Sequence, residues 1–183
     1  MILKNNIKIS LDKFIDKALY NKSKGYYEKK IPIGYKGDFI TSPNISIMFS
    51  EMIAIWIVSL WENLGSPKKI NIIELGAGTG EMMNQILKTV DNFKKFKASS
   101  KFYIHEKSVY LKRAQKDKNK EYEVKWIDNL NKISNYPSIF IANEFFDSLP
   151  IKQFVKKKII GLKNLYIQKT KNFIQLILKR KNQ

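Results

Sequence analysis

The sequence contains no cysteine, one histidine and only two arginines among its 34 basic residues. The absence of cysteine excludes disulfides, thiolate metal sites and cysteine nucleophiles, and it is compatible with a reducing compartment; we expect no metal site. The sequence also lacks the roughly 20-residue apolar run of a membrane-spanning helix. Its longest apolar stretch, residues 52–61, is interrupted by Ser59 and predicts a buried helix in a soluble protein. Residues 1–20 mix charged and apolar side chains, so we expect no secretion signal.

The net charge is +18, and a charge of this size is typical of proteins that bind nucleic acid or anionic surfaces. Arginine, however, occurs only at Arg113 and Arg180, so the charge comes almost entirely from lysine. Nucleic-acid surfaces favour arginine, whose planar fork makes bidentate contacts with bases and phosphates. We therefore expect scattered, solvated lysines and no nucleic-acid partner. The basic runs at residues 156–158 and 179–181 could bind an acidic partner, and this alternative stays open.

Glycine is also scarce, with eight in 183 residues, yet three of the eight alternate at Gly76, Gly78 and Gly80. They follow an apolar run and an acid, in the segment IIELGAGTG at residues 72–80. Glycines let a backbone turn sharply and approach a ligand closely. The segment therefore predicts a strand that runs into a ligand-binding loop and then a helix, the alternative being an ordinary glycine-rich turn.

The spacing of the glycines separates two classes of cofactor. A dinucleotide fingerprint reads G-x-G-x-x-G/A, with the pyrophosphate on the following helix N-terminus. Here Glu81 stands at the helix start, where its carboxylate would repel a pyrophosphate. S-adenosylmethionine (SAM) carries no phosphate, and the pattern E-x-G-x-G-x-G resembles motif I of class I SAM-dependent methyltransferases. That resemblance places SAM at Gly76, Ala77, Gly78 and Gly80, and implies that Glu74 orients its amino-acid end.

The rest of the pattern predicts an α/β fold: a Rossmann-like class I methyltransferase sheet with helices on both faces, incomplete at its C-terminal end. We expect one domain over residues 1–183, with N-terminal helices and a lid-like loop over 1–66 and the core over 67–183. The expected helices cover residues 9–19, 81–90 and 108–117, and the expected strands cover 70–75, 101–105, 122–126 and 138–143, with two or three more strands in 151–178.

A further helix is expected after Ser42-Pro43, which suit an N-cap and a first helical position. Its apolar residues form one stripe that we expect to lie in the core: Phe49, Met52, Ile53, Trp56, Leu60 and Leu64. The segment before it, residues 25–44, contains three glycines and two prolines and predicts a long irregular loop, which often acts as a lid.

Polar side chains follow three more of the expected strands, at Glu106, Asp128 and residues 143–144. Because ligands of parallel sheets bind beyond the carboxyl ends of the strands, we expect these residues to meet the glycine loop at one crevice. Glu106 can accept both ribose hydroxyls, and Asp128 can accept from the adenine amino group. Each is otherwise a solvated loop acid. His105 should point away from Glu106 and serve the structure.

Several sequence blocks, taken in order, resemble the MidA-like methyltransferases, whose mitochondrial member methylates an arginine of a respiratory complex I subunit. The blocks are ALYNKSKGYY (18–27), GDFITSPNIS (37–46), the glycine segment, HEKS (105–108) and ANEFFDSLPIKQF (142–154). The resemblance implies SAM as cofactor, a protein substrate such as a complex I subunit, and a cytoplasmic location in a bacterium or the mitochondrial matrix in a eukaryote.

The resemblance also assigns site residues. A guanidinium is a delocalised cation with a pKa above about 12, so an arginine methyltransferase needs carboxylates that hold it and help to remove a proton. Glu144 and Asp147, with Asn143 beside them, are the residues implied for this role; the alternative is that Asn143 and Asp147 only cap the local turn. Asp38 and Thr41, in the GDF-x-TSP block, are implied to fold over the cofactor.

The chain departs from the family in length, since family members are considerably longer. If nothing follows residue 183, an apolar sheet edge is left uncovered, which invites self-association or a partner chain. Two functions of different class therefore stay open. One is an active protein arginine methyltransferase, and the other is a truncated, catalytically impaired SAM-binding or assembly-factor remnant that acts by binding a protein.

Overall fold

The computed structural model describes residues 9–29, 33–34, 37–152, 165–170 and 173–178. The chain divides into two compact units, Met1–Lys152 and Gln153–Gln183. In the second unit, β5 (Leu165–Thr170) and β6 (Phe173–Leu178) form an antiparallel pair. No helix within the described part of the chain is both long and apolar enough to cross a membrane.

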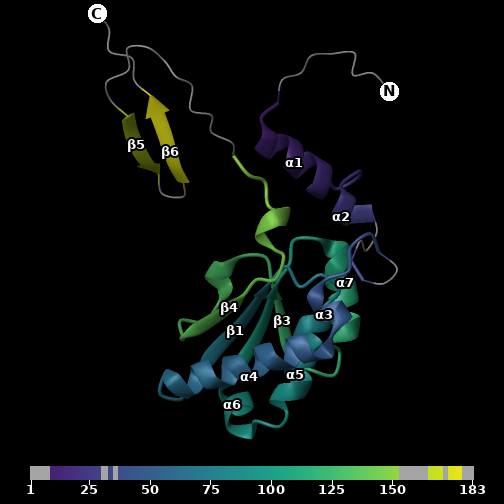
Figure 1. Ribbon diagram of the computed structural model, residues 1–183, viewed down its shortest axis with the longest axis vertical. Coiled ribbons are helices and arrows are strands. Elements are labelled where there is room, and N and C mark those ends of the chain that lie inside the picture. Colours follow the sequence, from purple (N-terminus) through teal and green to yellow (C-terminus); the bar gives the residue numbers. More distant parts are fainter. Residues whose placement is uncertain (1–8, 30–32, 35–36, 153–164, 171–172, 179–183) are drawn as a thin grey trace, which may run out of the picture. The chain divides into compact units, whose positions relative to one another are not determined.

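The first unit is organised around a parallel sheet with the strand order β3-β2-β1-β4 (Figure 1). Its strands are β1 (Ile70–Leu75), β2 (Ser100–His105), β3 (Val124–Ile127) and β4 (Ser138–Ile141). The strand β1, with the sequence INIIEL, is buried on both faces, as expected for an interior strand of a parallel sheet. The α/β class and the parallel sheet are thus confirmed, with strand bounds within two residues of those expected.

The register of the sheet brings the strand ends together. Leu75 of β1 lies opposite His105 of β2, and His105 lies opposite Ile127 of β3. On the other side of β1, Glu74 lies opposite Ile141. The residues that follow these strands therefore start from one edge of the sheet, where a ligand of a parallel sheet binds.

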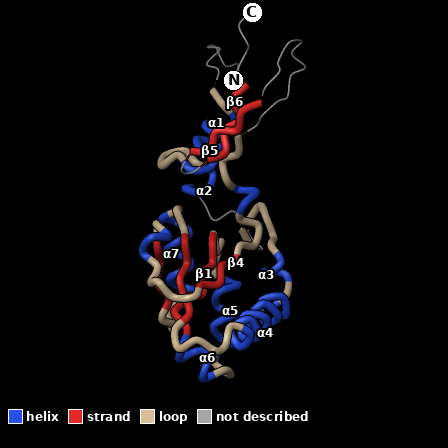
Figure 2. Tube along the Cα trace, turned by 90° about the vertical axis from the view of Figure 1, so that its left-hand side faces the viewer, coloured by secondary structure: helices blue, strands red, loops and turns tan. Residues whose placement is uncertain are grey.

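The helices that follow the strands build the main core. α5 (Glu81–Val90) packs against α4 (Ile47–Asn63), and Figure 2 shows the two on one side of the sheet. A short helix that the sequence did not predict, α6 (Lys94–Ser99), places Phe96 in the same core. α7 (Val109–Lys118) begins at Ser108, whose hydroxyl accepts a hydrogen bond from the Leu111 amide. This N-cap fixes the residues directly after Glu106.

The expected core stripe of α4 is wrong in half of its positions. Met52, Trp56 and Leu64 are 59%, 55% and 58% exposed, whereas Phe49, Ile53 and Leu60 are partly buried against the core. The fully buried face of the helix consists of Ser50, Ala54, Ile57, Val58 and Trp61. Because α4 is apolar on almost every side, its sequence alone did not indicate which side would face the sheet.

The N-terminal segment is irregular between short helices, as expected of a loop. It contains α1 (Leu11–Tyr20), α2 (Tyr26–Lys29) and α3 (Ser42–Ile45), with a bridge between Ile33 and Phe39. Two single 3-10 turns follow strands of the sheet: η1 (Leu130–Lys132) comes after β3, and η2 (Phe146–Ser148) comes after β4. Asp147 lies in the second of these, and the other two residues predicted to act on the acceptor, Asn143 and Glu144, lie just before it.

Candidate functional site

The glycine loop between β1 and α5 has the backbone that its sequence predicts. Gly76 and Gly78 have φ values of +67° and +53°, a left-handed conformation that costs other residues about 1–2 kcal/mol. Space is a second constraint, because a Cβ on Gly78 would lie 3.1 Å from Cδ1 of Ile33. A Cβ on Gly76 would lie only 2.5 Å from Cδ2 of Phe145. Glycine is therefore required at both positions, by the turn and by the side chains of Ile33 and Phe145 that pack on it.

A cavity of about 270 Å³ opens beside this loop. Its walls come from the loop itself, from the segment before α4 and from the turn that follows β4; the polar and acidic members are Tyr27, Thr41, Asn44, Glu74, Thr79, Glu81, Asn143, Glu144, Asp147 and Ser148. A second cavity, of about 140 Å³, is also lined by Tyr27, Ile33, Gly76, Gly78, Glu144 and Ser148, and adds His105 and Glu106. The two cavities therefore adjoin across the glycine loop.

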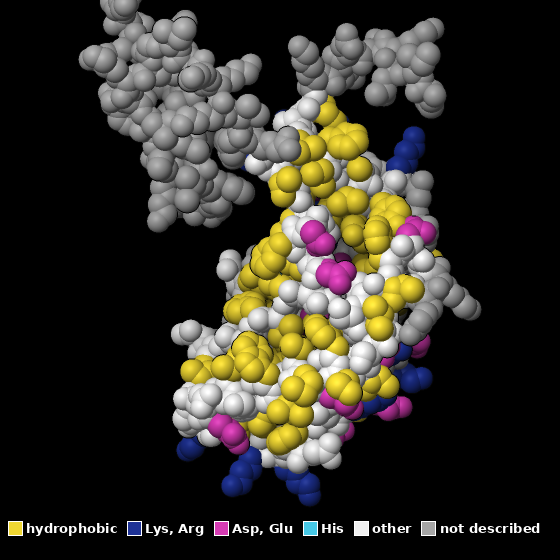
Figure 3. All heavy atoms as spheres, in the orientation of Figure 1, with side chains coloured by type: hydrophobic (Ala, Val, Ile, Leu, Met, Phe, Trp, Pro, Cys, Tyr) yellow, Lys and Arg dark blue, Asp and Glu magenta, His cyan; other side chains and the backbone are white. Residues whose placement is uncertain are grey.

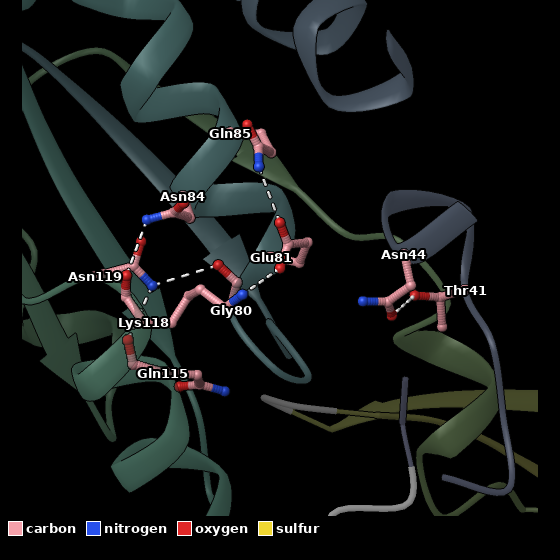
Figure 4. A network of polar contacts seen from close by, with 9 residues as sticks. All are labelled: Thr41, Asn44, Gly80, Glu81, Asn84, Gln85, Gln115, Lys118 and Asn119. Carbon is pink, nitrogen blue, oxygen red and sulfur yellow. Dashed lines mark hydrogen bonds and ion pairs between the residues drawn. The ribbon is translucent and has the colours of Figure 1, made fainter. Parts of the chain in front are cut away.

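The charge of the first cavity is opposite to that of the chain. Four acidic residues line it, Glu81, Glu144 and Asp147 as ordinary acids and Glu74 as a buried one with a raised pKa. No Lys, Arg or His occurs among its described lining residues, although the sequence has 34 basic and 16 acidic residues. Glu81 accepts hydrogen bonds from Lys118 and Gln85 at 2.6 and 2.9 Å (Figure 4). The other three form no ion pair with a described basic residue, so the cavity favours a cationic ligand.

Glu74 is the most buried of these acids, with 2% of its surface exposed. Its Oε2 atom has no hydrogen-bond partner among the described residues. Burial, with the nearby Glu106 carboxylate, raises the pKa of Glu74 to about 8. A buried acceptor without a donor is costly, and burial for the same reason favours the neutral, protonated form of this carboxyl.

The raised pKa of Glu74 predicts how stability depends on pH. The native state keeps this proton up to about pH 8 and the unfolded chain releases it near its ordinary value of 4.5. Between these values the native state binds more protons, so the free energy of unfolding should fall as pH rises, by up to about 1.4 kcal/mol per unit. Denaturant unfolding at pH 5.5, 6.5 and 7.5 should show this slope in the wild type and a smaller one in Glu74→Gln. Equal slopes would contradict the assignment.

Glu106 lies at the end of β2 in the second cavity and is 7% exposed. One carboxylate oxygen accepts hydrogen bonds from the Lys107 and Ser108 amides at 2.8 and 2.9 Å. Burial raises its pKa, although these hydrogen bonds and one from Gln115 act in the opposite direction. The protein thus fixes this carboxylate at the place where a ribose acceptor was predicted.

Gln115 is a buried residue that the sequence did not indicate. Its amide nitrogen donates to the Gly78 carbonyl at 2.9 Å and to the second Glu106 oxygen at 3.0 Å. Its amide oxygen accepts from the Trp126 indole at 3.0 Å. Gln115 therefore ties the glycine loop to Glu106 and β3. A glutamine inside a lysine-rich helix carries no sequence signal for such a role.

The turn after β4 brings together the three residues predicted to act on the acceptor. Asn143, Glu144 and Asp147 all line the first cavity. Glu144 has a φ of +49°, a conformation that is rare outside glycine and often marks functional sites. The turn is also held from outside, because the Tyr20 hydroxyl donates to the Ser148 carbonyl at 3.0 Å. The N-cap of η2 has no side-chain hydrogen bond among the described residues. This speaks against the alternative that Asn143 and Asp147 only cap the local turn.

The other predicted site residues are divided between cavity and surface. Thr41 lines the first cavity, where its hydroxyl donates to Asn44 at 3.0 Å (Figure 4). Gly80, Asp38 and Asp128 line neither of these two cavities. Asp38 accepts a hydrogen bond from the Tyr26 hydroxyl, and Asp128 is exposed and pairs with Lys132 at 2.6 Å.

Several residues that line the first cavity were not predicted. Tyr27, Ile33 and Asn44 are examples. They belong to the irregular N-terminal segment, where no strand or helix period indicates which side chains turn inward. No group of three or more potential metal ligands occurs among the described residues.

Residues 52–182 match a family model described as "Putative S-adenosyl-L-methionine-dependent methyltransferase". The chain belongs to this family. SAM, which the glycine spacing predicted, is therefore the cofactor of its family, and the resemblance drawn from the sequence blocks is confirmed. This chain is 32% identical over 180 residues to the mitochondrial protein arginine methyltransferase NDUFAF7 of Xenopus laevis, and the match covers 85% of this chain and 41% of that protein. For the human protein of that name the identity is 29% over 181 residues, covering 84% of this chain and 40% of the relative.

The chain thus spans about two fifths of the length of the curated relatives that it matches. Among solved structures it resembles a protein from Burkholderia thailandensis that was crystallised with S-adenosyl-homocysteine. That match has a TM-score of 0.66 and 22% identity, over 78% of this chain and 38% of the other. It confirms the Rossmann-like methyltransferase fold.

Proposed function

We propose that this chain binds SAM and transfers its methyl group to an arginine side chain of a protein. The observation that carries the proposal is the first cavity, which adjoins the glycine loop and is lined by four acidic residues and by no described basic residue. In a chain of net charge +18, such a cavity suits two cationic groups, the cofactor and a guanidinium. The names of the relatives, which are protein arginine methyltransferases, favour the same acceptor.

The residues present fit SAM on three grounds. At Gly76 and Gly78 the loop leaves no room for a Cβ between its backbone and the side chains of Phe145 and Ile33. Glu74 lines the first cavity beside the glycine loop and suits the ammonium of the amino-acid end, and Glu106 is fixed in the adjoining cavity, where it suits the ribose hydroxyls. When bound, SAM supplies an electrophilic methyl group on a sulfonium.

The protein's own contribution would be to position the acceptor and to receive its proton. Glu144 and Asp147 can hold the two sides of a guanidinium fork, since each carboxylate accepts two hydrogen bonds. Glu144 lines both cavities and so lies where cofactor and acceptor meet, which makes it the better candidate for the proton acceptor. Asn143 can add a carbonyl acceptor from the same turn.

The acceptor protein and the compartment are finer parts of this proposal. By family resemblance we propose a respiratory complex I subunit as substrate, in the cytoplasm of a bacterium or the matrix of a mitochondrion. β4 is an edge strand of its sheet with a half-exposed Phe140, and this favours the proposed self-association or a partner at that edge.

Cofactor binding is tested by a matched pair of glycine substitutions. Gly78 and Gly65 both have positive φ, +53° and +80°, but a Cβ on Gly65 meets nothing within 4 Å. Gly78→Ala should weaken SAM binding at least about tenfold, since its methyl group intrudes on Ile33 and distorts the loop. Gly65→Ala introduces comparable backbone strain and should leave the affinity within about twofold.

Isothermal titration calorimetry with SAM, on the wild type and both variants, provides the measurement. A wild type that releases no binding heat with SAM would refute the cofactor assignment. Equal weakening in both variants would show that the effect comes from backbone strain and not from the cavity.

A further inference from the structure

Large apolar side chains are exposed on the segments that line the first cavity. Phe39, Ile40 and Ile45 are 53%, 51% and 67% exposed, and Phe146 is 67% exposed. We call these four residues the apolar rim. Phe39 lines the cavity itself, Ile40 and Ile45 are chain neighbours of the lining residues Thr41 and Asn44, and Phe146 precedes the lining residue Asp147.

The rim has two sides that come from different parts of the chain. Residues 39–45 lie in the segment before α4, and Phe146 lies in η2 after β4. Figure 3 shows acidic side chains on this face with hydrophobic side chains gathered around them. The cavity that would accept a cation is thus bordered by apolar surface from both of its walls.

Both sides of the rim are held in place by aromatic contacts. The Tyr26 ring meets the Phe39 ring edge-on, with centroids 6.3 Å apart, and the Tyr26 hydroxyl donates to Asp38. The Phe146 ring meets the Phe145 ring edge-on at 5.5 Å, and Phe145 in turn lies against Gly76. Ordered aromatic side chains lose little conformational entropy on binding, so they are efficient contact residues.

We propose that the acceptor is a peptide segment in which the cationic side chain is flanked, within two residues on both sides, by apolar residues. The cation enters the carboxylate-lined cavity, while its neighbours pack on Phe39, Ile40 and Ile45 at one wall and on Phe146 at the other. In an extended peptide, two residues span about 7 Å, so neighbours of the inserted side chain reach the rim without leaving the mouth. This inference rests on the proposed function and names the substrate class for its site.

The chemistry of the rim disfavours two other acceptors. A free amino acid or small amine would fill the cavity and leave the exposed phenylalanines unused. An arginine in a glycine-rich or serine-rich segment would bring no apolar surface to them. Exposed apolar surface around a polar recognition site is typical of peptide-binding faces, where it supplies affinity by burial.

The test is a binding measurement with three fluorescein-labelled peptides of equal length, in the presence of saturating S-adenosyl-homocysteine. The first carries arginine between Leu and Val residues, the second carries arginine between Gly and Ser residues, and the third has citrulline in the first context. Fluorescence anisotropy should give an affinity at least about tenfold higher for the first peptide than for the second. This preference should fall below about threefold in Phe39→Ser and in Phe146→Ser.

A matched control is Leu64→Ser, which removes a 58% exposed apolar side chain at the far end of α4. It should keep the full preference. Equal affinities for the first two peptides, or a preference that survives in both rim variants, would overturn the inference. No binding of any peptide would overturn it as well. A citrulline peptide that binds as tightly as the first would instead refute the cation site of the proposed function.

Discussion

Trp61→Ala should lower the free energy of unfolding by about 3–5 kcal/mol, whereas Trp56→Ala, on the same helix, should lower it by less than about 1 kcal/mol. Trp61 is 7% exposed, its ring meets Phe96 edge-on at 5.5 Å, and its indole donates to the Pro67 carbonyl at 3.0 Å. Its removal leaves a cavity under α4 and an unpaired carbonyl. Trp56 is 55% exposed and loses little burial.

Urea unfolding followed by circular dichroism measures both values, and the two variants share the same change of residue type and helix propensity. The prediction fixes the orientation of α4, since a rotation of this helix by about half a turn would exchange the two costs. A loss for Trp56→Ala as large as that for Trp61→Ala would mean that the exposed side of α4 is covered in solution.

The orientation of α4 is also where prediction from the sequence failed for a clear physical reason. A helix with a polar side reveals its buried side by period, as the isoleucine and methionine positions of α5 do. α4 has apolar residues on nearly all sides, so the packing of Ala54 and Ile57 in the core, where α4 contacts α5, decided the orientation. The choice depends on tertiary contacts that no local pattern encodes.

The candidate site was predictable where one local motif determines it. Gly76 and Gly78 are required both for their backbone angles and for their lack of a side chain, so the glycine pattern alone predicted the loop. Glu106 and Glu144 follow strands whose ends meet, and this too follows from strand order and register. Asp128 also follows a strand, yet β3 is an edge strand, and its carboxylate pairs with Lys132 at the surface instead of lining either cavity.

The residues that were missed reach the site from a distance along the chain. Ile33 packs over Gly78 from the segment before α4, and Gln115 reaches the glycine loop from α7. These contacts join parts of the chain separated by about 40 residues, and neither partner carries a motif for the other. Such contacts depend on the complete packing, which is why a structure was needed to find them.

Glu144 is the residue on which turnover should depend most. It has no described ion-pair partner, it lines both cavities, and it is held at a φ of +49°. A strained conformation that orients a carboxylate into a site costs stability, and it is expected where the orientation serves binding or catalysis. Asp147, on the same turn, can hold the guanidinium but lines the first cavity alone, so its loss should affect acceptor affinity more than the rate.

Glu144→Gln should therefore lower kcat for methyl transfer to an arginine peptide by about 10²–10⁴-fold, the usual contribution of a general base. Glutamine keeps the size of the side chain and the backbone strain, so the Kd for SAM should stay within about twofold. Glu123→Gln, the same change at an exposed position of the described surface, should leave both values unchanged. Mass spectrometry of the peptide gives the rate and calorimetry gives the Kd. A Glu144→Gln variant with full activity would remove Glu144 from catalysis, and a wild type that binds SAM but transfers no methyl group would support the non-catalytic remnant.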